Sequence, residues 1–183
     1  MQSVNNFGHH KIIEIHEVVV DYNQTVLQMI EACQFESFDL AGGIRAYSQE
    51  EISYIIEDLF KINGTGIHKF RLAEIQLDDR DFNTGFQIDS ADAIEYLHKI
   101  GLVPAKIEHL LAYKKKITKE DYNITALGSC YNGMVTNSLK EEDLYPGIVN
   151  NIFVIFLRNE FFTSCSEDER DWLPEFNHFL VIV

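Results

Sequence analysis

The densest group of side chains able to bind a partner lies near the C-terminus, where four carboxylates precede the only tryptophan. These residues are Glu167, Asp168, Glu169, Asp171 and Trp172. An exposed aromatic ring rimmed by carboxylates suits a basic protein surface, because aromatic side chains anchor interfaces and opposite charges select the partner. The same run is also typical of a charged helical turn with Trp172 tucked into the core. We predict a partner-binding site at these five residues.

A second acidic group, Asp78, Asp79 and Asp81, follows an expected strand, and carboxylate oxygens there can bind magnesium or calcium. The spacing lacks the glycine and terminal glutamate of a helix-loop-helix calcium loop, and Arg80 favours local ion pairing. A solvated turn is the simpler interpretation. We therefore predict no metal site, although whether the three aspartates bind a metal stays open.

The residues that could supply a nucleophile or an acid–base pair form no known motif. Cys130 follows Gly128 and Ser129 without the second glycine of a hydrolase nucleophile elbow. None of the seven histidines stands in a His-Glu-x-x-His arrangement, which would place two zinc ligands on one helical face. Folding could still bring Cys130 next to His109 or His178, so its reactivity stays open. We predict no catalytic, cofactor-binding or metal-binding residues.

The three cysteines, Cys33, Cys130 and Cys165, are widely spaced and include no CxxC pair. This pattern argues against both a disulfide framework and a zinc site, and it fits a reducing compartment. The chain contains no apolar run near the ~20 residues that a membrane helix needs. We therefore expect a soluble, cytoplasmic protein with no membrane partner.

The net charge of −14, from 15 basic and 29 acidic residues, disfavours binding to nucleic acid or anionic lipid. The one candidate basic patch consists of Lys114, Lys115, Lys116 and Lys119. Without arginine or an aromatic platform, this patch is more typical of the solvated end of a helix. We predict no nucleic-acid partner. The acidity itself either recruits a basic protein or simply keeps the chain in solution.

Two expected strands and two expected helices alternate in the first part of the chain. Residues 12–20 and 67–77 show the alternation of strands. Asn23 can cap a helix with apolar residues at helical spacing, and a capping-box signature begins a second helix over residues 48–62. These segments predict a helix-rich first part.

A third expected helix begins near Asp89 or Ser90 and ends at Gly101, and Pro104 suits the first turn of a fourth. Beyond Ile124, short apolar runs separated by Gly, Asn, Pro and acidic turns predict strands. The predicted fold is a single α+β domain over residues 1–183. It has about four helices in the first part and a strand-rich C-terminal third that forms a mixed or antiparallel sheet. Residues 1–10 are expected to be a mobile N-terminus.

The most specific sequence pattern is Gly101-Leu102-Val103-Pro104-Ala105 leading to His109-Leu110-Leu111-Ala112. A further match is Ala126-Leu127-Gly128-Ser129. With shorter matches at residues 19–22, 29–32, 93–97 and 179–181, the chain resembles a set of uncharacterised bacterial proteins. The resemblance implies a shared fold and a bacterial or phage-related origin, and it carries over no activity. The chain departs from it in the helix expected over 48–62 and in its single tryptophan.

Two classes of function remain. The first is a non-enzymatic, acidic interaction protein of the immunity, antitoxin or inhibitor type that binds a basic protein surface. The alternative is a small enzyme or ligand-binding domain whose site is assembled from residues distant in sequence. We favour the first class because missing motifs count more against an enzyme than against a binding protein. The partner or substrate, the oligomeric state and the strand order stay open.

Overall fold

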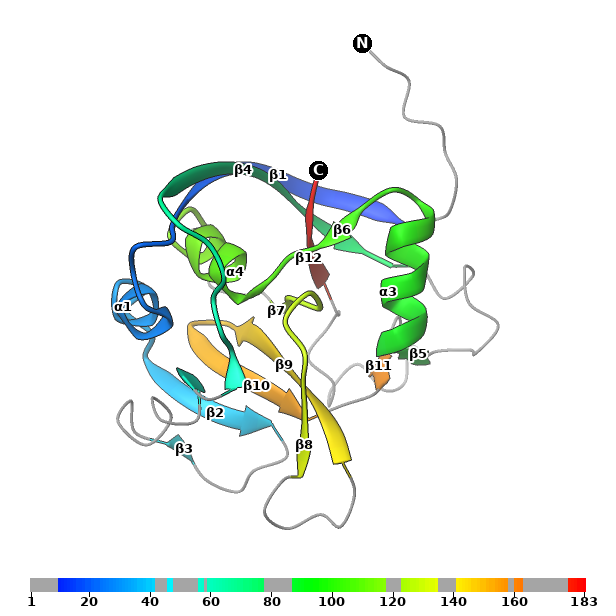
Figure 1. Ribbon diagram of the computed structural model, residues 1–183. Coiled ribbons are helices and arrows are strands. Elements are labelled where there is room, and N and C mark those ends of the chain that lie inside the picture. The colour runs from blue at the N-terminus through cyan, green and yellow to red at the C-terminus, as the bar shows by residue number, and fades with distance from the viewer. Residues whose placement is uncertain are drawn as a thin grey trace.

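The chain folds around a mixed β-sheet with helices on both faces (Figure 1). The computed structural model describes residues 10–41, 46–47, 56–57, 59–77, 87–117, 123–134, 141–157, 160–162 and 178–183. The helices are α1 (Val26–Glu31), α3 (Ser90–Lys99) and α4 (Ile107–Lys114). The strands are β1 (Lys11–Asp21), β2 (Ser37–Ala41), β3 (Ala46–Tyr47), β4 (Ile67–Gln76), β5 (Gln87–Asp89), β6 (Val103–Pro104), β7 (Asn123–Thr125), β8 (Tyr131–Met134), β9 (Glu141–Val149), β10 (Ile152–Leu157), β11 (Glu160–Phe162) and β12 (His178–Ile182).

Ten of the described strands form the main sheet. Eight follow the order β1-β4-β12-β7-β9-β10-β2-β3, while β6 pairs with β12 and β8 pairs with β9. The pairs β12–β7 and β10–β2 are parallel, and the other pairs are antiparallel. Strands β5 and β11 form a separate antiparallel pair. The C-terminal strand β12 thus lies between β4 and β7, inside the sheet.

The two faces of the sheet bury two hydrophobic cores. Helices α1 and α4 cover one face, and α3 covers part of the other. Alternation along β4 shows the division, because Leu72 belongs to the core beneath α4 whereas Ala73 and Ile75 belong to the core beneath α3. The later part of β4 is covered on both faces, and its successive residues from Leu72 to Ile75 are all buried.

The longest strand pair joins β1 to β4. Six of the eleven residues of β1 are Ile or Val, and β-branched side chains favour the extended backbone. The antiparallel register runs from Lys11 opposite Gln76 to Asp21 opposite Ile67, with an irregularity between Ile12 and Glu14. These two strands, expected from the sequence, carry the candidate site described below.

The prediction of a helix-rich first part is wrong. The first half of the chain supplies strands β1 to β5, and the sheet draws on the whole chain rather than on its C-terminal third. Of the helix expected over 48–62, residues 56, 57 and 59 are helical, residues 60–62 are not, and the others lie outside the described residues. The mixture of helices and strands is present, but local periodicity could not show how much of the chain pairs across one sheet.

The predicted third helix is confirmed, and the predicted start of the fourth is wrong. Helix α3 ends where Gly101 adopts the left-handed conformation, with φ +82°, and Leu102 N–H bonds to the carbonyl of Leu97. Pro104, expected in the first turn of the next helix, instead belongs to β6 opposite Val181. Helix α4 begins three residues later, because proline suits a short edge segment as well as a helix start.

Candidate functional site

Strand β1 lies at one end of the strand order, and among the described residues it pairs only with β4. One hydrogen bond shows which backbone groups of β1 face β4. In it, Tyr22 N–H donates to the carbonyl of Gly66 at 2.8 Å. Because an antiparallel ladder alternates, the even-numbered residues of β1 bond to β4. The N–H and C=O groups of Ile15, Glu17 and Val19 therefore point to the outer edge.

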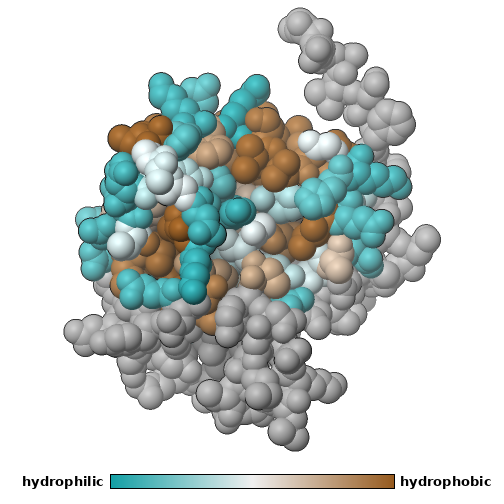
Figure 2. Space-filling model, viewed as in Figure 1, coloured by the Kyte–Doolittle hydropathy of each residue, from teal (hydrophilic) through white to brown (hydrophobic). Residues whose placement is uncertain are grey.

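The outer face of β1 and the start of β4 carries exposed aliphatic side chains. Ile15 is 42%, Val19 51% and Ile67 66% exposed. Helix α3 packs on this side of the sheet against the other end of β4, through Ala73, Ile75 and Leu77. In Figure 2, brown hydrophobic patches interrupt the hydrophilic surface in the upper part of the molecule, where β1, β4, β6 and the end of β12 lie in Figure 1. The edge and this face together form a candidate binding surface, called here the β1 edge surface.

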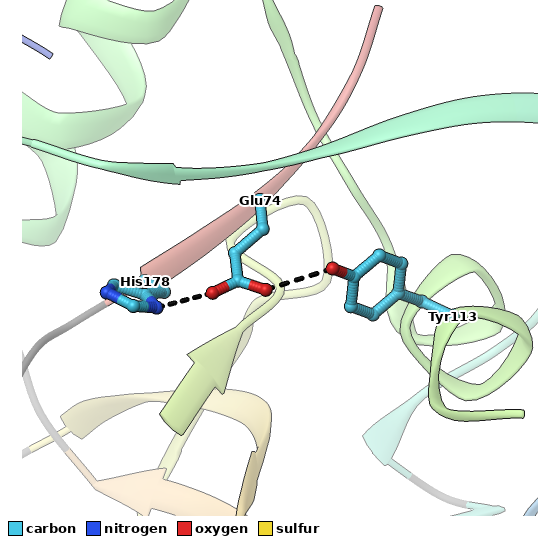
Figure 3. Close-up of polar contacts among 3 residues, drawn as sticks. All are labelled: Glu74, Tyr113 and His178. Carbon is cyan, nitrogen blue, oxygen red and sulfur yellow. Dashed lines mark hydrogen bonds and ion pairs between the residues drawn. The ribbon is translucent and has the colours of Figure 1, made fainter. Parts of the chain in front are cut away.

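A buried polar cluster supports the sheet behind this surface. Glu74 of β4 is only 4% exposed, and it lies on the face that α4 covers. Tyr113 of α4 donates its hydroxyl hydrogen to Glu74 Oε2 at 2.9 Å, and Nδ1 of His178 in β12 lies 2.5 Å from Glu74 Oε1 (Figure 3). An unpaired buried carboxylate would be costly, so these contacts stabilise both oxygens. Three elements distant in sequence thereby meet at one side chain.

The polar cluster continues to β1. Glu14 stands directly opposite Glu74 in the strand register, and His16 Nε2 lies 2.9 Å from Glu14 Oε1. The ring of His16 packs edge-on against Tyr113, with 5.2 Å between ring centroids. We call these five residues, Glu14, His16, Glu74, Tyr113 and His178, the Glu74 cluster. The ring contact between His16 and Tyr113 joins the inner side of β1 to helix α4, while the outer edge of β1 faces away.

The Glu74 cluster can bind a proton, and its carboxylate can hold the His178 ring in a fixed orientation. A carboxylate that contacts Nδ1 of an imidazole fixes the ring, as it does in acid–base pairs of enzymes. In the described part of the chain, no group of three or more His, Cys, Asp or Glu residues is arranged to hold a metal ion. The described helices are also too short or too polar to cross a membrane. The geometry of the cluster explains how the sheet tolerates a buried carboxylate.

The sequence-predicted residues fall mostly outside the described structure. Positions 78, 79, 81, 165 and 167–172 lie there, so neither the acidic run with Trp172 nor the aspartate group can be placed. Lys114 is half-buried, and Lys115 and Lys116 are exposed at the end of α4, as expected for a solvated helix end.

Cys130 is described, and its surroundings do not activate it. The thiol bonds to Tyr145 and Asp143 rather than to a histidine. Partial burial raises its pKa, and Asp143 adds to the rise. The thiol therefore stays protonated at neutral pH. The possibility that folding brings Cys130 to His109 or His178 is not realised.

Comparison with protein-family models, with curated proteins and with solved structures finds no match to this chain. The resemblance to uncharacterised bacterial proteins therefore stays a prediction. The site must be interpreted from its own residues.

Sequence reasoning missed both β1 as an edge strand and Glu74 as a buried carboxylate. The sequence contains a signal for each of these two features. Aliphatic residues occur at both even and odd positions of β1, which is unusual for a strand with one solvent-facing side. Glu74 interrupts the apolar run from Leu72 to Ile75, and a charge inside such a run indicates either a bulge or a buried partner.

Proposed function

We propose that this chain acts by binding a basic protein, which adds a β-strand along the β1 edge surface. The main support for the proposal is that β1, a strand of eleven residues, pairs with another strand on one side only within the described structure. A long strand edge is a template for another strand, and natural proteins usually shorten, twist or cover it. The irregularity near Ile12 protects one end of β1, but pairing from Glu14 to Asp21 is regular. Eight residues are sufficient for strand addition.

The charge of β1 favours a basic partner. The strand carries three carboxylates, on Glu14, Glu17 and Asp21, and one lysine, Lys11. Cross-strand pairs of opposite charge stabilise a sheet, whereas like charges facing each other destabilise it. The net charge of −14 adds long-range attraction for a basic protein and speeds the encounter. Binding of this kind fits a protein of the immunity, antitoxin or inhibitor type.

Apolar contacts would supplement the main-chain bonds. Ile15, Val19 and Ile67 stand on one face beside the open edge, where alternate side chains of an added strand can pack against them. Main-chain hydrogen bonds then provide affinity, and these aliphatic side chains provide selectivity. Behind the edge, the ring contact between His16 and Tyr113 packs β1 against helix α4.

The test places a photo-crosslinking side chain at Val19 and maps which protein it captures in the cells that make this chain. The captured protein is then purified and titrated against the wild type and against Glu17→Pro. The Glu17 N–H points outward, so proline removes a bond to the partner without breaking the β4 ladder. We expect affinity to fall at least about tenfold.

Glu17→Gln is the matched control, because it keeps the outward N–H and removes only the charge. We expect it to weaken binding by about two- to threefold at low salt and less at high salt. The proposal is overturned if the captured protein binds folded Glu17→Pro as tightly as the wild type. An acidic partner, or binding that salt leaves unchanged, would contradict the electrostatic part.

A further inference from the structure

A cavity of about 270 Å³ opens where the end of β1 and the start of β4 meet helices α1 and α4. Its apolar walls are Val19, Val20, Met29, Ile67 and Ala112. Its polar lining residues are Asp21, Gln24, Glu108 and Lys115. Apolar walls with a few convergent polar groups are typical of small-molecule sites, and this volume is just below their usual lower limit. Only a small ligand fits.

Helix α4 brings Glu108 to this cavity. Glu108, Ala112 and Lys115 follow at helical spacing, so one face of the helix lines it. Glu108 is 3% exposed, and its side chain hydrogen-bonds to that of Tyr22. Burial raises the pKa of the Glu108 carboxyl group, because desolvation disfavours the charged form, while the nearby Lys106 and the hydrogen bond from Tyr22 lower it by smaller amounts. A cation that entered the cavity would favour the ionised carboxylate.

The charges of the other lining residues support a cationic ligand. Asp21 and Glu108 oppose the single positive charge of Lys115, which is exposed at the end of α4. Asp21 accepts hydrogen bonds from the backbone and side chain of Asn23 at 3.0 and 2.8 Å, so its carboxylate is held in position. The cavity therefore combines a buried acid, a positioned acid and apolar walls.

We propose that this cavity binds a small protonated amine with an apolar substituent. The ammonium group bonds to Glu108, and the substituent packs against Val20, Met29 and Ala112. The site goes beyond the proposed protein-binding function. Val19 and Ile67 line both the cavity and the β1 edge surface, whereas Glu108, Met29 and Ala112 belong to the cavity alone, so the tests on Glu108 and on Glu17 can fail separately.

The test titrates the full chain with three probes that share one alkyl group: 3-methylbutylamine, 3-methylbutan-1-ol and 3-methylbutanoate. Binding is followed by calorimetry and by amide shifts in NMR spectra. We expect saturable amine binding that shifts Met29 and Ala112, alcohol binding at least about tenfold weaker, and weaker binding still of the carboxylate. The proposal is overturned if the amine does not bind, if the carboxylate binds as tightly, or if shifts scatter over the acidic surface.

Two variants test the charge assignment. Glu108→Gln keeps the side-chain volume, and we expect it to weaken amine binding at least about tenfold. Lys115→Gln removes an exposed like charge, and we expect it to strengthen amine binding about two- to fivefold. If Glu108→Gln does not fold, the Lys115→Gln result decides alone. Unchanged or weaker amine binding to Lys115→Gln, or full binding to folded Glu108→Gln, contradicts the proposal.

Discussion

At the scale of single residues, three polar side chains are buried where α4 meets the sheet: Glu74, Glu108 and His109. The buried ring of His109 is neutral at pH 7, because burial and the nearby Lys106 lower its pKa to about 4. The backbone N–H of Lys106 donates to His109 Nδ1 at 3.1 Å, which assigns the proton of the neutral ring to Nε2. The ring also packs edge-on against Phe70, with 4.4 Å between centroids.

The low pKa of His109 predicts a loss of stability in acid. The unfolded histidine has a pKa of 6.5, so between pH 6.5 and about 4 the unfolded chain binds a proton that the folded chain does not. Stability is therefore complete above pH 6.5 and falls as the pH decreases. His109→Gln keeps an acceptor for Lys106 N–H without a titrating ring. Urea unfolding of both proteins should show the wild type losing roughly 3 kcal/mol relative to the variant between pH 7 and pH 4. A difference that does not vary with pH would contradict this assignment.

At the scale of elements, the Glu74 cluster ties α4 to the sheet. Tyr113 is the last buried residue of α4, and its hydroxyl reaches a carboxylate on β4 that also contacts β12. This contact positions the helix along the strands more specifically than apolar packing does. It also keeps β4 in place as the partner strand of β1.

Removing the Tyr113 hydroxyl should therefore destabilise the fold. Tyr113→Phe leaves the ring in place and removes one donor from buried Glu74, which should lower the free energy of unfolding by about 1–3 kcal/mol. The control is a double-mutant cycle with Glu74→Gln, in which the tyrosine change should cost less. Equal costs of Tyr113→Phe in both backgrounds would show that the two groups are not coupled. Chemical denaturation of the four proteins measures the cycle.

Two segments that carry the sequence resemblance meet at the start of α4. Gly128 N–H donates to the carbonyl of Ala105 at 2.8 Å, and Ile107 N–H donates to Ser129 Oγ at 2.9 Å. A Cβ on Gly128 would lie 2.4 Å from the carbonyl oxygen of Pro104, so only glycine fits there. These contacts explain why glycine occurs at position 128 and serine at position 129.

At the scale of the whole molecule, the net charge of −14 opposes compaction. At neutral pH, raising the salt concentration from about 20 to about 200 mM should screen this repulsion and raise the Tm by a few degrees. The control is the same experiment near pH 5, close to the sequence pI of about 4.8, where the net charge is small and salt should have little effect. Calorimetry at both pH values provides the measurement. A Tm that falls with salt at neutral pH would show that favourable ion pairs outweigh the repulsion.

The amino-acid sequence by itself determined the features that depend on neighbouring residues. Alternation predicted the strands that became β1 and β4. The start of α3 was expected near Asp89 or Ser90 and its end at Gly101, because helix-end and strand preferences act over a few residues. The cap of α1 also follows from local chemistry, although Thr25 rather than Asn23 provides it.

Only the tertiary structure decided which segments meet. Pro104 joins a strand because Val181 lies beside it, and Glu74 can be buried because Tyr113 and His178 arrive from α4 and β12. The position of β1 at the end of the strand order depends on every other pairing in the sheet. Residues that meet from distant segments are not separated by a fixed number of positions, so no sequence pattern marks their contact. The β1 edge surface and the cavity beside Glu108 therefore became visible only in the folded chain.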